Sequence, residues 1–239
     1  MPLVKLGDSI GEQIVQAAKD ESIQIEANDI IVIAQKIVSK AEGNVLDLSS
    51  VHPSRLAETI AKTSDKDPRH VEVILRESIS IVRMRGAHLI VETPHGFVCA
   101  NAGVDRSNVG KNDSVVLLPV DPDKSAKMIR RRIMELTGAN VGVIISDTFG
   151  RAWRNGQVNV AIGLAGLSPI VDYRGTDDMF GNQLSVTQIA IADELASAAE
   201  LVMRKSDRIP VAIIRGVKYV KDDGSIKPLI RPKEEDLFR

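Results

Sequence analysis

The sequence has little cysteine, few aromatic residues and no long apolar run. Its 239 residues include a single cysteine, Cys99, so no disulfide can form within the chain and a thiolate zinc site is excluded. Aromatic residues make up 3% of the chain, which argues against a surface that stacks single-stranded nucleic acid. No apolar stretch approaches the roughly 20 residues of a membrane helix, and the first residues lack a signal-peptide core. These absences predict a cytoplasmic protein with neither a nucleic-acid nor a membrane partner.

The common nucleotide and nucleophile motifs are also missing. There is no G-x-x-x-x-G-K-[ST] loop, no G-x-G-x-x-G turn after a strand and no G-x-S-x-G elbow. The four histidines do not have the spacing of a metal site. Cys99 falls inside a predicted strand, where a thiol usually acts as a small buried apolar side chain. The chemistry of the chain must therefore come from other residues.

Helical and strand patterns alternate along the chain. Net charge is −1 and 44% of the residues are hydrophobic, which is ordinary for a globular protein. Helices are predicted over 9–20, 54–62, 68–77, 122–137 and 188–204, and strands over 30–34, 88–92, 96–100, 114–118, 141–146 and 211–214. The strands at 88–92 and 96–100 form a predicted hairpin. We expect an α+β fold with mixed, partly antiparallel sheets and packed helices. Residues 1–239 form a single unit, or two intimately associated α+β subdomains without a clear linker.

Carboxylates stand at the ends of predicted strands. Asp105 follows the strand that ends near residue 100, and Asp147 with Thr148 directly follows the strand 141–146. Loops at strand ends are held by a rigid scaffold and still reach solvent, which suits catalysis. Carboxylate and hydroxyl oxygens are ligands that Mg²⁺ or Mn²⁺ prefers. The alternative is that both aspartates are turn or cap residues, as aspartate often is.

Basic residues lie close to these positions in the sequence. Arg151 and Arg154 stand between Gly150 and Gly156, shortly after Asp147. Arginine forks and free backbone N–H groups both suit phosphate. Lys36 and Lys40 follow the first predicted strand and could both reach an anion, although exposed lysines are common.

Four segments occur in an order that is more specific than any one of them. They are Val38-Ser39-Lys40-Ala41-Glu42-Gly43, Asn101-Ala102-Gly103-Val104-Asp105-Arg106-Ser107-Asn108-Val109, Leu118-Pro119-Val120-Asp121-Pro122-Asp123-Lys124-Ser125 and Ser146-Asp147-Thr148-Phe149-Gly150-Arg151. With these segments the chain resembles the coenzyme F420-0:L-glutamate ligase family, also called the CofE family. The likeness covers nearly the whole chain.

The resemblance implies a reaction and an assembly. Such enzymes are GTP- and metal-dependent ligases that activate the terminal carboxylate of F420-0 as an acyl phosphate. L-glutamate then attacks, giving a γ-linked amide, GDP and phosphate, and further glutamates can follow. The implied cofactors are Mg²⁺ or Mn²⁺ with K⁺, and GTP is the co-substrate. The implied architecture is a CofE-like fold in an intertwined homodimer.

The resemblance also assigns roles to residues. It implies Asp105, Asp147 and Arg151 as catalytic residues, and Asp105, Asp147 and Thr148 as metal ligands. It implies nucleotide contacts at Pro2, Leu3, Val4, Gln35, Lys36, Lys40, Asn108, Lys205 and Ser206.

The sequence departs from the family pattern in two places. The family has a strand before its Leu-Pro-Leu-like segment, whereas Met1 stands at that border here. The loop after Met203 is short and basic where many members have a Gly-Glu-rich loop, which resembles a bacterial branch without the fused nitroreductase domain. Two alternatives stay open. One is an amide ligase for a different carboxylate metabolite, and the other is a non-catalytic nucleotide-binding dimer.

Overall fold

The fold is built around a four-stranded mixed sheet. The structure is a computed structural model that describes residues 1–106 and 113–238. Strands lie in the order β11-β1-β7-β8, where β1 (Ile30–Ala34) runs parallel to β7 (Gly142–Arg151) and antiparallel to β11 (Val211–Ile214). The strand β8 (Arg154–Ala165) forms a long antiparallel hairpin with β7. The sheet confirms the predicted α+β class with mixed, partly antiparallel pairing.

Helices pack on this sheet and on one another through their apolar faces. The helix α1 (Ile10–Asp20) packs on α5 (Pro122–Thr137), α5 packs against β7 and β8, and α6 (Ile191–Met203) packs against β8 and β11. The caps follow the predicted chemistry, since Ser9 accepts a hydrogen bond from Glu12 N and Asp121 accepts one from Lys124 N. These elements enclose the main core, in which the first four residues of β1 are fully buried.

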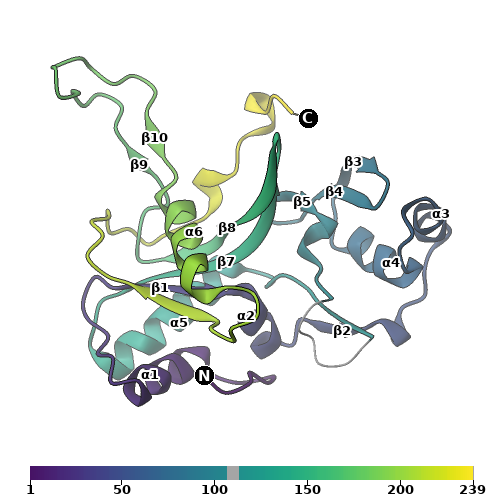
Figure 1. Cartoon of the computed structure of the whole chain (residues 1–239), viewed down its shortest axis with the longest axis horizontal. Helices are drawn as coiled ribbons and strands as arrows, with labels where there is room; N and C mark the ends of the chain where they lie inside the picture. Colours follow the sequence, from purple (N-terminus) through teal and green to yellow (C-terminus); the bar gives the residue numbers. More distant parts are fainter. Residues whose placement is uncertain (107–112, 239) are drawn as a thin grey trace.

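A second, smaller lobe interrupts the chain between β1 and β7. It contains α3 (Arg55–Ser64), α4 (Pro68–Arg76), the pair β2 (Val45–Asp47) with β6 (Ser114–Val116), and the sheet β3-β4-β5. The bounds of that sheet are β3 (Ser80–Arg85), β4 (His88–Glu92) and β5 (Val98–Ala100). Most of its buried apolar residues form clusters separate from the main core, which Cys99 of β5 joins. Figure 1 shows this lobe on the right of the β7–β8 hairpin.

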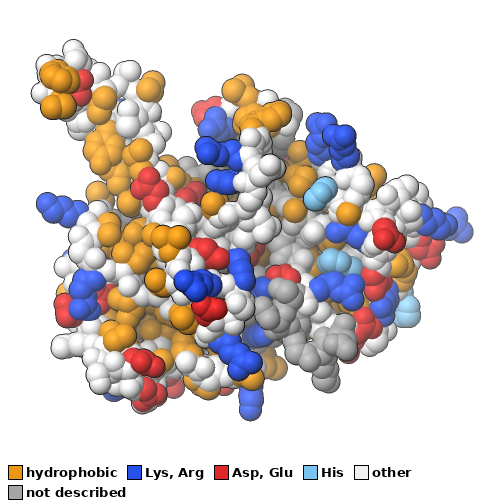
Figure 2. Space-filling view, in the orientation of Figure 1, with side chains coloured by type: hydrophobic (Ala, Val, Ile, Leu, Met, Phe, Trp, Pro, Cys, Tyr) orange, Lys and Arg blue, Asp and Glu red, His pale blue; other side chains and the backbone are white. Residues whose placement is uncertain are grey.

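A thin arm leaves the body on the other side (Figure 1). It starts at β9 (Val171–Asp172) and returns at β10 (Gln188–Ile189), which pair antiparallel at its base. Its apolar side chains are largely exposed, with Met179 at 88% and Phe180 at 80%. Figure 2 shows these hydrophobic side chains gathered toward the tip.

Three sequence predictions differ from the structure. The helix predicted over 188–204 starts only at Ile191, because Gln188 and Ile189 pair with β9 instead. The strand predicted over 141–146 runs on to Arg151, because its second half pairs with the unpredicted β8, so Asp147 and Thr148 lie inside β7 and do not follow it. The helix α2 (Gln35–Glu42) was missed, because it follows β1 without a turn residue or a side-chain cap. Across the described part of the chain, no helix has the length and apolarity needed to cross a membrane.

Candidate active site

The point where β1 ends, and with it the parallel pairing of β1 and β7, places the central residues. Ala34 of β1 lies opposite Ser146 of β7, so Gln35 and Asp147 follow at the same edge of the sheet. The helix α2 begins at Gln35, and its cap residue Ala34 has no side-chain oxygen to bond the first N–H groups. An open sheet binds ligands at such strand ends, and unsatisfied N–H groups of a helix N-terminus favour anions.

Asp105 is brought to this edge by the second lobe. Its backbone bridges Val116, with Asp105 N donating to Val116 O at 3.0 Å and Val116 N donating to Asp105 O at 2.8 Å. The Lys36 Nζ lies 2.6 Å from Asp105 Oδ2. Lys36 is in the first turn of α2, so this ion pair joins the two lobes at the strand ends.

The ionised form of the Asp147 carboxyl is electrostatically unfavourable at its position. Burial, and then the charge of Asp105, raise the pKa of Asp147 to about 6, against the lowering effects of the Thr148 backbone, Lys36 and Lys205. Asp147 is half-buried beside a second carboxylate. A cation between the two aspartates would relieve both the burial penalty and their repulsion.

The donor set fits a hard divalent cation. Among residues 1–106 and 113–238, no group of three or more His, Cys, Asp or Glu could hold a metal ion. Two carboxylates are nevertheless what Mg²⁺ typically takes from a protein when substrate phosphates and water complete its octahedron. Asp105 and Asp147 therefore fit a metal that a phosphate ligand shares.

Thr148 points into a polar cluster with Lys205. The Lys205 ammonium contacts Thr148 Oγ1 and lies 3.2 Å from Glu200 Oε1. Thr148 Oγ1 donates to Asn159 Oδ1 at 2.7 Å, and Asn159 is 4% exposed. A positive charge thus already stands at the Thr148 hydroxyl, one residue beyond Asp147.

The helix α2 carries further groups suited to an anion. Gln35 is buried, its Oε1 accepts from Ser39 Oγ at 2.9 Å, and its Nε2 is a buried donor without a partner in the described structure. Lys40 lies one turn after Lys36, and burial followed by the charge of Lys36 lowers its pKa. Lys36 in the first turn and Lys40 in the last turn lie four residues apart on α2, so they share one side of the helix.

The backbone before Asp105 is strained. Asn101 and Ala102 both have φ 55°, and Gly103 follows at φ 69°. Left-handed backbone costs a non-glycine residue roughly 1–2 kcal/mol, so the surroundings must hold this turn in place. Lys66 Nζ donates to Asn101 Oδ1 at 2.9 Å, and the ring of buried His70 bonds the backbone at Val104.

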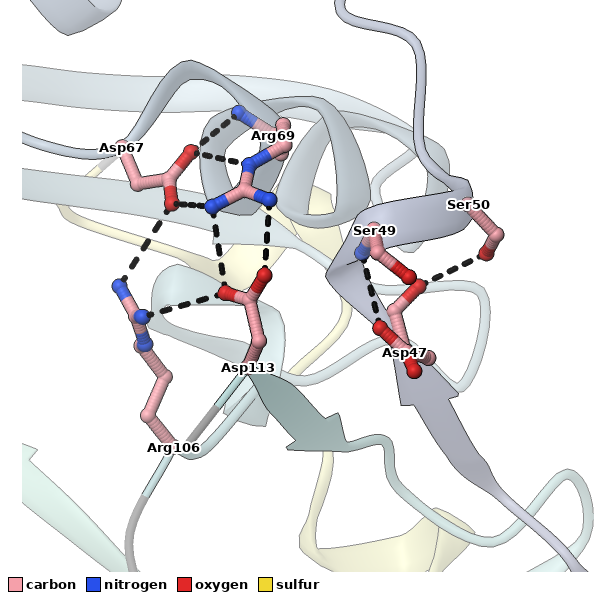
Figure 3. A network of polar contacts seen from close by, with 7 residues as sticks. All are labelled: Asp47, Ser49, Ser50, Asp67, Arg69, Arg106 and Asp113. Atoms are coloured by element: carbon pink, nitrogen blue, oxygen red, sulfur yellow. Dashed lines mark hydrogen bonds and ion pairs between the residues drawn. The ribbon is translucent and has the colours of Figure 1, made fainter. Parts of the chain in front are cut away.

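An arginine network fixes the chain on either side of the segment 107–112 (Figure 3). Arg69 of α4 lies 2.7 Å from Asp67 Oδ2 and 2.8 Å from Asp113 Oδ2. Arg106 joins the same two carboxylates at 4.0 Å each. The hydrogen bond from Arg69, opposed by burial, lowers the pKa of Asp67. Arg106 directly follows Asp105, so this network ties the predicted ligand to α4.

The remaining predicted residues lie elsewhere. Arg151 is exposed at the hairpin tip, where its Nη2 donates to Asn155 O at 2.8 Å, and four residues of strand separate it from Asp147, about 13 Å. In the segment 2–4, Val4 packs against the main core, and a little further on Gly7 N donates to Ala41 O of α2 at 2.9 Å. Ser206 is exposed next to Lys205, and Asn108 lies outside the described residues. The roles of these residues stay predictions.

Asn159 was missed by the sequence analysis. It lies in β8, which was not predicted, and its buried amide accepts from Thr148. The alternation Val158-Asn159-Val160-Ala161-Ile162 was the available signal, because a polar residue within an apolar strand pattern indicates a bonded side chain.

Known proteins resemble this chain over its whole length. Residues 1–216 match the family model described as F420-0:Gamma-glutamyl ligase. A protein of Methanothermobacter thermautotrophicus named coenzyme F420:L-glutamate ligase is 50% identical over 243 residues, covering 100% of this chain and 96% of the relative. Relatives of the same name from Methanocaldococcus jannaschii and Archaeoglobus fulgidus are 50% and 40% identical, covering 96% and 100% of this chain and 92% and 93% of themselves.

Proposed function

The chain belongs to the F420-0:γ-glutamyl ligase family, and from this premise we propose that it joins L-glutamate to coenzyme F420-0 through a γ-linked amide, using GTP. The observation that carries the proposal is the arrangement of Asp105, Asp147 and Lys36 at the edge where β1 and its pairing with β7 end. That edge combines two carboxylates, an ammonium and the start of a helix. Phosphoryl transfer needs these elements more than it needs a covalent residue.

The proposed reaction has two steps. A carboxylate oxygen of F420-0 attacks the γ-phosphorus of GTP, the bond to the β-phosphate oxygen breaks, and an acyl phosphate and GDP result. The amine of glutamate then attacks the acyl carbon, phosphate leaves with the former carboxylate oxygen, and the nitrogen loses a proton. Repetition of the same steps on the new glutamate would add further residues.

The α2 side chains would bind the phosphates. Lys36 and Lys40 supply positive charge, and the N–H groups of the first α2 turn, which Ala34 does not cap with a side chain, supply donors. The buried Gln35 Nε2 has no hydrogen-bond partner among residues 1–106 and 113–238 and would be a further donor for the nucleotide. Together they would orient the γ-phosphate toward the aspartates.

Asp105 and Asp147 would hold Mg²⁺ or Mn²⁺. When bound, the cation neutralises charge on the β- and γ-phosphate oxygens. Lys36 would then turn from Asp105 toward the phosphates, since the two positive charges compete for one carboxylate. K⁺ as a further cofactor rests on family resemblance alone.

The position of Lys205 changes what we propose for the second metal site. The resemblance places a ligand of a second cation at Thr148, but the Lys205 ammonium already contacts that hydroxyl. We propose that Lys205 supplies to the phosphates part of the charge that a second cation would bring. Glu200 at 3.2 Å holds Lys205 in this place.

The arm supports a homodimer. A single chain leaves Met179, Phe180 and Val186 at least four-fifths exposed on a projection with no packing of its own. Apolar side chains on such a projection suit insertion into a second copy of the chain.

The proposed activity is tested by product mass. Purified protein is incubated with F420-0, L-glutamate, GTP and Mn²⁺, and we expect a product heavier by one glutamyl residue together with one GDP. Parallel reactions with ATP, and with other carboxylate metabolites as acceptors, decide the specificity. Folded protein that makes the amide only on another carboxylate favours the first alternative, and GTP binding without GDP release favours the non-catalytic one. Either result would overturn the proposal.

A further inference from the structure

An apolar cleft lies between the β7–β8 hairpin, β5 and the C-terminal tail. Its volume is about 230 Å³. Its lining includes Phe97, Phe149 and Val160, together with Leu229 and Ile230 of the tail. The two phenylalanine rings meet edge to face, with centroids 6.1 Å apart. Pockets for whole drug-sized ligands run to roughly 300–1,000 Å³, so this cleft suits one flat portion of a larger ligand.

The cleft is on the same face of the sheet as Asp147. Alternate residues of a strand share a face, so Phe149 points to the side of Asp147. Val160 is the cross-strand partner of Asp147, and directly opposed residues also share a face. Phe149 and Val160 therefore border both the cleft and the carboxyl. Two residues of strand separate Phe149 from Asp147, a distance of about 7 Å.

The tail wall is held at both ends. Ser225 Oγ donates to Asp123 Oδ2 at 2.9 Å, and Ile226 N donates to the same carboxylate. Lys233 Nζ lies 3.1 Å from Glu92 Oε2, whose side chain is largely buried. The tail is thus anchored to α5 on one side and to β4 on the other. It also lies beyond the residues 1–216 that the family model covers.

Polar groups stand at the edges of the apolar walls. Asp193 lines the cleft with one oxygen accepting from Ala161 N at 2.9 Å, and Arg231 and Asp236 line it from the tail. Apolar faces with polar groups at the rim match a planar heteroaromatic ring, which has two apolar faces and a polar edge. An aliphatic, charged ligand such as glutamate would make poor use of a lining that consists mostly of apolar side chains, two of them aromatic.

We propose that this cleft binds the deazaflavin ring of the acceptor, so that the flexible chain of the acceptor carries its terminal carboxylate to the edge at Asp147. The assignment rests on the proposed function for the identity of the acceptor. It gives the C-terminal tail a role in substrate binding, with Leu229 and Ile230 as the residues that contact the ring. Nucleotide and ring then approach Asp147 from different sides, the nucleotide from α2 and the ring from the tail.

The test is a binding titration that does not depend on turnover. The intrinsic fluorescence of F420-0 is followed as the full-length protein is added, for the wild type and for Ile230→Trp, which fills the cleft. We expect Ile230→Trp to weaken F420-0 binding at least about tenfold. The KM values for GTP and glutamate should stay within about twofold, since these ligands do not enter the cleft. Val220→Trp makes a similar change at a position 61% exposed outside the cleft and is the matched control.

A second variant tests whether a loss of binding could come from misfolding. Leu229→Asp puts a charge on the half-exposed cleft wall, and it should weaken F420-0 binding while the melting temperature stays near that of the wild type. The free chromophore, without its phosphate-bearing chain, should show the same loss. Unchanged F420-0 affinity in both folded variants would overturn the cleft assignment and leave the proposed function intact. Wild-type protein that binds F420-0 in the cleft but makes no amide would overturn the proposed function alone.

Discussion

The negative charge of Asp147 lowers the stability of the folded chain, yet it is the charge that the proposed cation would bind. In the folded chain its pKa is about 6, above the ordinary 3.8, because it is buried and lies near Asp105. A carboxyl with a raised folded pKa favours the fold when protonated, and that contribution is lost as the pH rises through 6. The site therefore gives up stability at neutral pH to present a charge that a cation can bind.

Replacing Asp147 by asparagine separates the effect of its charge on turnover from the effect on stability. Asp147→Asn keeps the shape and removes the charge, so we expect turnover to fall by roughly two orders of magnitude or more. Metal-free protein at pH 8 should unfold at the same temperature as the wild type or higher, and the difference should shrink toward pH 4. Calorimetric melting across pH, with Asp222→Asn in the exposed tail as control, measures this. A large loss of stability with turnover intact would show that Asp147 is a structural cap.

His70 makes the opposite contribution. Burial, with the charges of Lys66 and Arg106, lowers its pKa to about 4 from the ordinary 6.5. The unfolded chain takes up the proton first as the pH falls, so the fold should lose on the order of 2 kcal/mol between pH 6.5 and 4 through this residue. His70→Asn should flatten that part of the profile in urea unfolding, whereas His52→Asn at an exposed position should not. Parallel profiles for wild type and His70→Asn would contradict this role.

At the scale of the elements, α5 and β8 are in close contact at Gly163. A Cβ there would lie 2.4 Å from the Pro122 carbonyl carbon at the start of α5, so the helix would have to move. We expect Gly163→Ala to destabilise the chain by about 1–3 kcal/mol. Gly150→Ala in β7 meets nothing within 4 Å and should be close to neutral. Equal denaturation midpoints for the two variants would contradict the close packing of α5 on β8.

The elements also show what sequence patterns can and cannot predict. α1 and α5 were predicted because Ser9 and Asp121 are local N-cap residues, and β1 was predicted from its buried apolar run. β8 was missed because its first half is polar and exposed, so no periodicity marks it, and pairing with β7 holds it instead. At the site, the residue types at 105 and 147 indicated a metal. Their meeting with Lys36 depends on long-range packing that no local pattern encodes.

At the scale of the whole molecule, the arm between β9 and β10 carries large apolar side chains that a single chain leaves exposed. Met179→Ser together with Phe180→Ser should convert a dimer into a monomer, because these side chains have no apolar surroundings in one chain. Light scattering after size exclusion measures the mass, and Leu56→Ser, exposed on α3, is the control. A wild-type monomer at micromolar concentration, or a dimer that survives both changes, would contradict this assignment.

The central claim is that the two lobes bring a carboxylate acceptor and a γ-phosphate together between Asp105 and Asp147. It is tested most directly with F420-0 labelled with ¹⁸O in its terminal carboxylate, in a reaction with GTP and glutamate. Attack by the carboxylate on phosphorus predicts one ¹⁸O in the released phosphate for each amide formed. Unlabelled phosphate beside the glutamylated product, or no glutamylated product from folded protein, would contradict the account.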